Sequence, residues 1–196
     1  MAKTVLEGIR TNAWAKLSFA DPELELRRLR GMQIALAPFA GPAKVKNLRT
    51  NRLNWARQRR EAAIFTYGVR TCVLKRPAFY AMCEEGDLDF IVTWNQHDTQ
   101  HFAPVQLKEV VPRSTNPNAT LEAALHKLSK YTDSSDLIVA IHLNQRGRTN
   151  FRSLIVPGIN IAELWIFGAS RPDQSRWFLA GDLLRQAEYH EFDHPS

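Results

Sequence analysis

Two neighbouring segments of alternating polarity constrain the fold of this chain more than any other feature. In residues 88–94, apolar side chains alternate with a second set that includes Asp89, which is the pattern of a β-strand with two different faces. Residues 102–111 form the second segment, in which Gln106 and Lys108 share one face. The polar stretch between the segments is short enough for a hairpin connection. The sequence therefore predicts two adjacent strands that carry an acid, an amide and an ammonium group.

Helix and strand patterns flank this hairpin. Apolar positions recur at helical spacing over residues 48–69, and residues 78–83 form a short apolar run typical of a strand. After the hairpin, Thr120 or Asn118 can cap a short amphipathic helix, and residues 136–143 are typical of a buried strand. A strand-helix-strand ending requires a crossover, so the predicted fold class is α/β with a mixed sheet.

Further elements are expected at both ends of this core. Asp21 and Pro22 start a predicted helix over residues 22–30, which Gly31 would end. Beyond the core, residues 153–156 and 163–167 are expected to add strands, and Asp182 is expected to cap a last helix. We therefore divide the chain into a helical appendage, residues 1–43, and a domain, residues 44–196. Within the domain, the core covers about residues 48–143 and the C-terminal extension covers residues 144–196.

Composition and charge narrow the function classes. A length of 196 residues suits one domain with additions, and 44% hydrophobic and 23% charged residues are ordinary for a soluble globular protein. The N-terminal residues do not form a secretory signal and no apolar run is long enough for a membrane span, so we expect a cytoplasmic protein without a membrane partner. The net charge of +6 favours a polyanionic partner such as DNA, because basic side chains that neutralise phosphates release counterions.

The segments GDLDFIV and VQLKE, with the predicted order helix, three strands, helix, strand over residues 48–143, resemble the catalytic core of the PD-(D/E)XK nuclease superfamily. They are most similar to the Mrr-like restriction endonucleases, in which a QxK pattern is familiar. The resemblance covers about half of the chain and is an analogy of fold and pattern. In this family, an acid on the second strand and an acid two residues before a lysine on the third strand bind magnesium. Asp89 matches the first acid, whereas Gln106 stands where Asp or Glu is usual.

This resemblance implies a magnesium-dependent endonuclease that hydrolyses phosphodiester bonds in DNA, with Mn²⁺ as an alternative ion. Magnesium prefers oxygen ligands, so the implied ligands are Asp89, the amide oxygen of Gln106 and the carbonyl oxygen of Leu107. A further acid is expected from the hairpin region or from the long helix; the candidates are Glu84, Glu85, Asp87 and Glu61, of which Glu85 is assigned to the metal and Glu61 to catalysis. Lys108 would orient the attacking water and stabilise charge on the phosphate.

Basic side chains on both predicted helices are candidates for contact with nucleic acid. They are Arg52, Arg57, Arg59 and Arg60 on the long helix and Lys127 and Lys130 on the second helix. An ordinary solvated helix face explains the same charges without a ligand. Cleavage of both DNA strands would make a homodimer plausible.

Two alternatives to a nuclease stay open. A catalytically inactive module of the same fold could bind nucleic acid or a protein partner, and Asp89 and Lys108 could form a plain cross-strand ion pair. The HExxH match at residues 190–194 is discounted as a zinc site because it is expected to lie in a terminal tail. Cys72 and Cys83 lack CxxC spacing, and the chain has no Walker, Rossmann or GxSxG pattern, which argues against thiolate zinc sites, nucleotide hydrolases, dehydrogenases and serine hydrolases.

Overall fold

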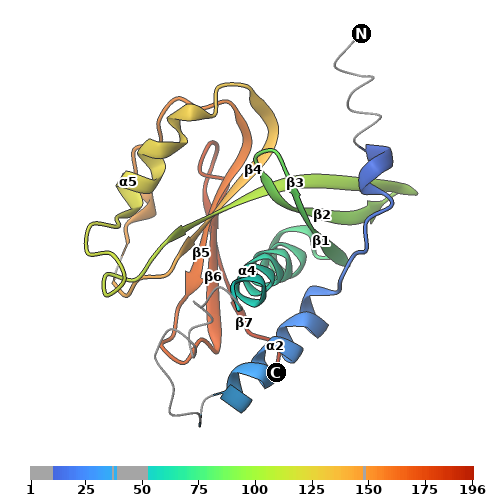
Figure 1. The fold of residues 1–196 in the computed structure, drawn as a ribbon. Helices are drawn as coiled ribbons and strands as arrows, with labels where there is room; N and C mark the ends of the chain where they lie inside the picture. Colours follow the sequence, from blue (N-terminus) through green and yellow to red (C-terminus); the bar gives the residue numbers. More distant parts are fainter. Residues whose placement is uncertain (1–10, 37, 39–52, 148) are drawn as a thin grey trace.

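The computed structural model describes residues 11–36, 38, 53–147 and 149–196, and the strands in these ranges form one curled mixed sheet in the order β1 to β7 (Figure 1). The strands β3, β4 and β5 are parallel to one another, and the other neighbouring pairs are antiparallel. The predicted mixed sheet is therefore confirmed. The strands are β1 (Ala78–Glu85), β2 (Leu88–Gln96), β3 (Thr99–Val110), β4 (Ser134–Leu143), β5 (Ile161–Ala169), β6 (Arg176–Gly181) and β7 (Glu188–Asp193).

The described helices lie before β1 and between later strands. Helix α4 precedes β1, and α5 with the 3₁₀ turn that follows it connects β3 to the parallel strand β4. No helix in the described part of the chain is long and apolar enough to cross a membrane. The helices are α2 (Pro22–Leu36), α4 (Asn54–Gly68) with a π-helical continuation (Val69–Leu74), α5 (Leu121–His126), and 3₁₀ turns at Lys127–Lys130 and Phe151–Ser153.

The sheet separates two hydrophobic cores. Phe65 of α4 packs with Val105 and Phe167 on one side, which we call the α4 face. Leu125 of α5 packs with Ile91 on the other side, which we call the α5 face. Successive residues of a strand point to opposite sides, so membership of these two cores tells which face each polar side chain shares.

Helix α4 packs against the C-terminal strand at a glycine. A Cβ atom built on Gly68 would lie 2.7 Å from Cε1 of the Phe192 ring on β7. Phe192 is buried in the α4-face core. Glycine at the end of α4 therefore permits a close approach that any larger side chain would obstruct.

The N-terminal helix differs from its predicted extent. Its start is confirmed, because Asp21 Oδ1 accepts the backbone N–H of Glu23 at 2.8 Å as an N-cap. However, α2 continues through Gly31, and nothing lies within 4 Å of the position of a Cβ there. A lone glycine costs a helix only about 1 kcal/mol, and packing of buried Leu26 and Leu29 offsets that cost. The predicted start of the next helix, at residue 48, lies outside the described residues.

Three C-terminal elements also differ from expectation. Residues 153–156 form no strand, since the chain there leaves a 3₁₀ turn without regular structure. Asp182 caps a turn instead of a helix, accepting the backbone N–H of Leu184 at 3.0 Å and that of Leu164 at 2.9 Å. The predicted tail at residues 190–194 belongs largely to β7, which pairs with β6, so the HExxH residues alternate between two faces. By contrast, the predicted strand at 163–167 lies within β5.

Candidate functional site

The central strands bring two of the predicted site residues into direct contact. The β2–β3 ladder ends at the pair Phe90 and Val105. Beyond it, Oδ2 of Asp89 accepts a hydrogen bond from the Gln106 side-chain amide and another from the backbone N–H of Leu107, the latter at 2.7 Å. The Asp89 carboxylate thus occupies a place that a backbone carbonyl would take in a continuous ladder.

The Gln106 amide lies among several oxygen atoms. Its Nε2 contacts Asp89 Oδ2 and lies 3.5 Å from the carbonyl oxygen of Leu107, while its Oε1 accepts the hydroxyl of Tyr131 at 3.3 Å. Gln106 is only 8% exposed, and Tyr131 is buried. Lys130 adds positive charge nearby, because its Nζ lies 4.8 Å from the centre of the Tyr131 ring. The Asp89 carboxylate and the Leu107 carbonyl oxygen of the predicted D…QxK site therefore converge on the Gln106 amide nitrogen, and both are hard oxygen donors of the kind that Mg²⁺ prefers.

Lys108 stands on the same side of the sheet as Gln106. It is opposite Ile141 in the β3–β4 register, as Gln106 is opposite Val139, and both partners belong to the α5-face core. Within the described residues, Asp89 and Lys108 form no ion pair, so a simple cross-strand pair does not explain them. The lysine is half-buried, close to the convergent oxygens in sequence and on their face.

Glu85 and Glu61 occupy other surroundings. Glu85 is exposed at the end of β1, opposite Leu88. Glu61 is buried on α4, where its Oε1 lies 3.1 Å from Nδ1 of His142, and the His142 ring stacks on Phe167 of the α4-face core. The structure therefore does not bring Glu61 together with the Asp89 group, from which the sheet separates it.

A second polar cluster surrounds Glu61 and was not predicted. The Arg57 guanidinium lies 2.6 Å from Oε2 of Glu109 and 3.6 Å from Oε1 of Glu61, and Asn144 donates to the other oxygen of Glu109 at 2.8 Å. Glu61, Glu109 and His142 present ligand atoms within 4.8 Å of one another and could hold a metal ion. In this arrangement, however, Arg57 supplies the positive charge that the two carboxylates require. We call the side chains of Arg57, Glu61, Glu109 and His142 the Arg57 cluster.

The predicted nucleic-acid-binding arginines of the long helix have internal partners. Arg57 belongs to the cluster above, and Arg59 pairs with Glu25 of α2 at 3.4 Å. Arg60 is buried, donates to Oε1 of Gln174 at 2.5 Å and lies 5.3 Å from the Trp177 ring centre. Burial lowers the pKa of Arg60 to about 10, which keeps the guanidinium charged at neutral pH.

The remaining basic candidates lie elsewhere. Arg52 falls outside the described residues. Lys127 and Lys130 are exposed on the 3₁₀ turn after α5, whose start is capped by Thr120 as predicted. Of the predicted basic residues that the structure describes, these two lysines are therefore the most open to solvent.

The chain was compared with known proteins. No family model, curated protein or solved structure matches it. Function must therefore be argued from geometry and chemistry.

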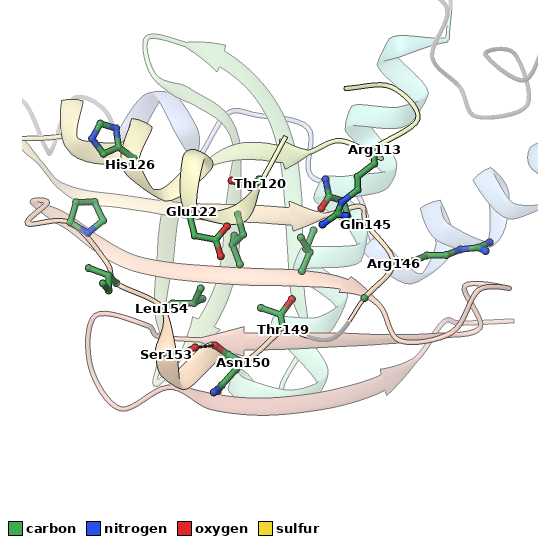
Figure 2. A pocket seen from close by; sticks show the side chains of 15 residues that line it. Arg113, Thr120, Glu122, His126, Gln145, Arg146, Thr149, Asn150, Ser153 and Leu154 are labelled. Carbon is green, nitrogen blue, oxygen red and sulfur yellow. Dashed lines mark hydrogen bonds between the residues drawn. The ribbon is translucent and has the colours of Figure 1, made fainter. Parts of the chain in front are cut away.

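A cleft of about 580 Å³ lies between α5 and the segment after β4 (Figure 2). His126 and Glu122 of α5 line one side, and Asn150 and Ser153 line the other. The Gln145 side-chain amide donates to the backbone carbonyls of residues 111 and 119 at 2.8 and 2.7 Å, and so stabilises the loop between β3 and α5. None of the D…QxK residues lines this cleft, whose lining includes both charge signs. It is therefore separate from the candidate site.

Proposed function

We propose that this chain is a magnesium-dependent nuclease of the PD-(D/E)XK type that hydrolyses phosphodiester bonds in DNA. The observation that carries the proposal is the contact of the Asp89 carboxylate with both the Gln106 amide and the Leu107 backbone across β2 and β3. Support also comes from the element order α4, β1, β2, β3, α5, β4, which is the order that the resemblance implies. The parallel pairing of β3 and β4 agrees with that arrangement.

The proposed metal ligands are the Asp89 carboxylate, the Gln106 amide oxygen and the Leu107 carbonyl oxygen. A half-turn of the Gln106 amide would place its oxygen between the other two groups, where its nitrogen lies now. The Tyr131 hydroxyl can donate to an oxygen or accept from an N–H, so after this rotation it can still form a hydrogen bond with the Gln106 amide. When bound, the ion would offset charge that develops on the phosphate.

Lys108 would act on the phosphate and the attacking water. An ammonium group on the α5 face can hold a water molecule for in-line attack and stabilise the negative oxygens of the transition state. Lys130 lies over the Tyr131 ring and would contact a flanking phosphate of the strand, and Lys127 precedes it on the same exposed turn.

A second candidate function is a catalytically inactive module that binds nucleic acid. One observation favours it: the Asp89 carboxylate replaces a backbone partner of Leu107, which is a structural task that needs no catalysis. The shortage of carboxylates near Gln106 also weakens metal binding, because the proposed ligand set has a single negative charge.

Cleavage assays separate the two candidates. Plasmid and linear duplex DNA are incubated with the protein in Mg²⁺, in Mn²⁺ and in chelator, beside D89N, K108A and the control R28Q, which removes an exposed charge on α2. The proposal expects cleavage that needs the metal, that is lost in D89N and K108A, and that survives in R28Q. DNA binding without metal-dependent cleavage by the wild-type protein supports the inactive module. Equal cleavage by all variants indicates a contaminating nuclease and overturns the assignment of these residues.

A further inference from the structure

A second cleft lies beyond the carboxyl ends of the parallel strands β3, β4 and β5. Its volume is about 690 Å³, and its walls come from residues 112–114, 142–147 and 169–172 with Gln174 and Trp177. In sheets with parallel strands, ligands commonly bind in the crevice outside the carboxyl ends of the strands. Asp89, Gln106 and Lys108 do not line it, so it is distinct from the proposed nuclease site.

Positive charge dominates this cleft. Arg113, Arg146 and Arg171 line it, each on the loop that follows one of the three parallel strands, and no described lining residue carries a carboxylate. In the described part of the chain, none of these arginines forms an ion pair. The Asp173 carboxylate, on the same loop as Arg171, accepts the backbone N–H and the hydroxyl of Ser175 at 3.1 and 2.8 Å. These hydrogen bonds lower the pKa of Asp173, and the Arg171 charge acts in the same direction.

A positioned imidazole forms part of the cleft wall. His142 is only 4% exposed, and its ring is fixed by stacking on Phe167 with a centre-to-centre distance of 5.1 Å. Nδ1 faces Glu61, whose carboxylate favours the tautomer that carries a proton there. Nε2 has no hydrogen-bond partner among the described residues, which leaves it for a ligand.

We propose that this arginine-lined cleft binds the phosphate group of a ligand. Guanidinium groups match phosphate oxygens in charge and in paired hydrogen-bond geometry, and three of them around one cleft favour a doubly charged phosphate over a single carboxylate. Arg113 and Arg146 also line the cleft of Figure 2, so both clefts share these two arginines. The ligand's phosphate binds Arg113, Arg146 and Arg171 with His142 beside it. This inference does not depend on nuclease activity.

The test is a titration with inorganic pyrophosphate in the presence of chelator. Calorimetry measures the affinity, and nuclear magnetic resonance monitors the imidazole nitrogen signals of His142. R146Q and R171Q each remove one exposed charge from the cleft, and R28Q removes an exposed charge on α2, where the Arg28 side chain is 75% accessible. Each cleft variant is expected to weaken binding roughly tenfold, while R28Q binds as the wild type does. The Nε2 signal of His142 is expected to shift on binding.

Two results would overturn the inference. One is the absence of pyrophosphate binding, and the other is an equal loss of binding in R28Q and the cleft variants, which would indicate unspecific attraction to net charge. A parallel titration with a short single-stranded DNA oligonucleotide identifies the source of the phosphate. The same dependence on Arg146 and Arg171 for DNA points to a nucleic-acid strand, and dependence for pyrophosphate alone points to a small phosphorylated ligand. If the wild-type protein binds pyrophosphate in this cleft but does not cleave DNA, only the nuclease proposal is rejected.

Discussion

Asp89 on β2 accepts the backbone N–H of Leu107 on β3 at 2.7 Å, in a place where the ladder between the two strands has ended. The carboxylate therefore has a structural partner as well as its proposed role as a metal ligand. Substitutions can separate these two tasks, because asparagine keeps an acceptor for the N–H whereas alanine does not.

We predict that D89A lowers the free energy of unfolding by about 1–3 kcal/mol, since the buried Gln106 amide and the Leu107 N–H lose their acceptor. D89N should cost less than D89A because its side-chain oxygen can still accept from Leu107. Urea denaturation followed by circular dichroism measures both. Equal stability of D89A and the wild-type protein would show that the Leu107 contact contributes nothing.

Tyr131 is predicted to position Gln106. In Y131F, the Gln106 Oε1 atom loses its hydroxyl donor, which should reduce unfolding free energy by about 1 kcal/mol. The affinity for Mn²⁺ should fall roughly tenfold, because groups that orient metal ligands commonly have effects of that size. Calorimetric titration with Mn²⁺ provides the measurement, and Y67F on α4 is a control away from the Asp89 group. An unchanged Mn²⁺ affinity in Y131F would reject the positioning role.

The sequence could predict the strands that carry Asp89 and Gln106, because alternation over residues 88–94 reports directly which side chains share a face. It missed the tight turn between them. The predicted loop 95–101 contains only two turn residues, His97 and Asp98, both with positive φ. The remaining residues of this stretch extend the two strands, and their polar side chains are why the sequence did not indicate a strand there.

The second cluster illustrates what periodicity leaves undetermined. Glu109 follows Lys108 in sequence, yet alternation sends it to the α4 face, where it meets Arg57 of a distant helix. The helix pattern correctly placed Glu61 on a long helix but said nothing of which sheet face that helix covers. His142 was a detectable signal, as a polar residue inside the apolar run of β4. Its partner could be known only from the packing of α4.

Removal of Arg57 tests the Arg57 cluster. R57A removes the guanidinium that contacts both the buried Glu61 and the nearby Glu109, and we expect a loss of about 3 kcal/mol in unfolding free energy. Mn²⁺ should restore part of this stability, because Glu61, Glu109 and His142 could then hold the ion without competition from the guanidinium. Thermal melting with Mn²⁺ and with chelator gives the comparison. A midpoint that Mn²⁺ raises equally in R57A and wild type would contradict this interpretation.

Gly68 is expected to resist substitution. In G68A, the added methyl group would lie 2.7 Å from the ring of Phe192, so strain of about 1–3 kcal/mol should exceed the gain in helix propensity of about 1 kcal/mol. Thermal denaturation measures the change. The double variant G68A/F192L should recover part of the loss, whereas G31A, where nothing obstructs a Cβ, should be neutral or stabilising. A stabilised G68A would disprove the close approach.

His194 predicts a dependence of stability on pH. Burial lowers its pKa below the ordinary value of 6.5, and the positive charges of Arg60 and Arg30 act in the same direction. The unfolded chain therefore binds the proton more readily, so this contribution to stability is complete well above pH 6.5 and is lost as the pH falls from there towards the folded pKa. Urea unfolding at pH 7.5 and 5.5 should show a smaller decrease for H194Q than for wild type. An identical decrease would assign the effect to other groups.

Electron paramagnetic resonance of Mn²⁺ bound in the presence of duplex DNA tests the central claim most directly, because the two clusters lie on opposite faces of the sheet. The nuclease proposal predicts that D89N abolishes the bound Mn²⁺ signal and that E61Q leaves it unchanged. A signal that persists in D89N and disappears in E61Q would move the metal to the α4 face and contradict a D…QxK active site.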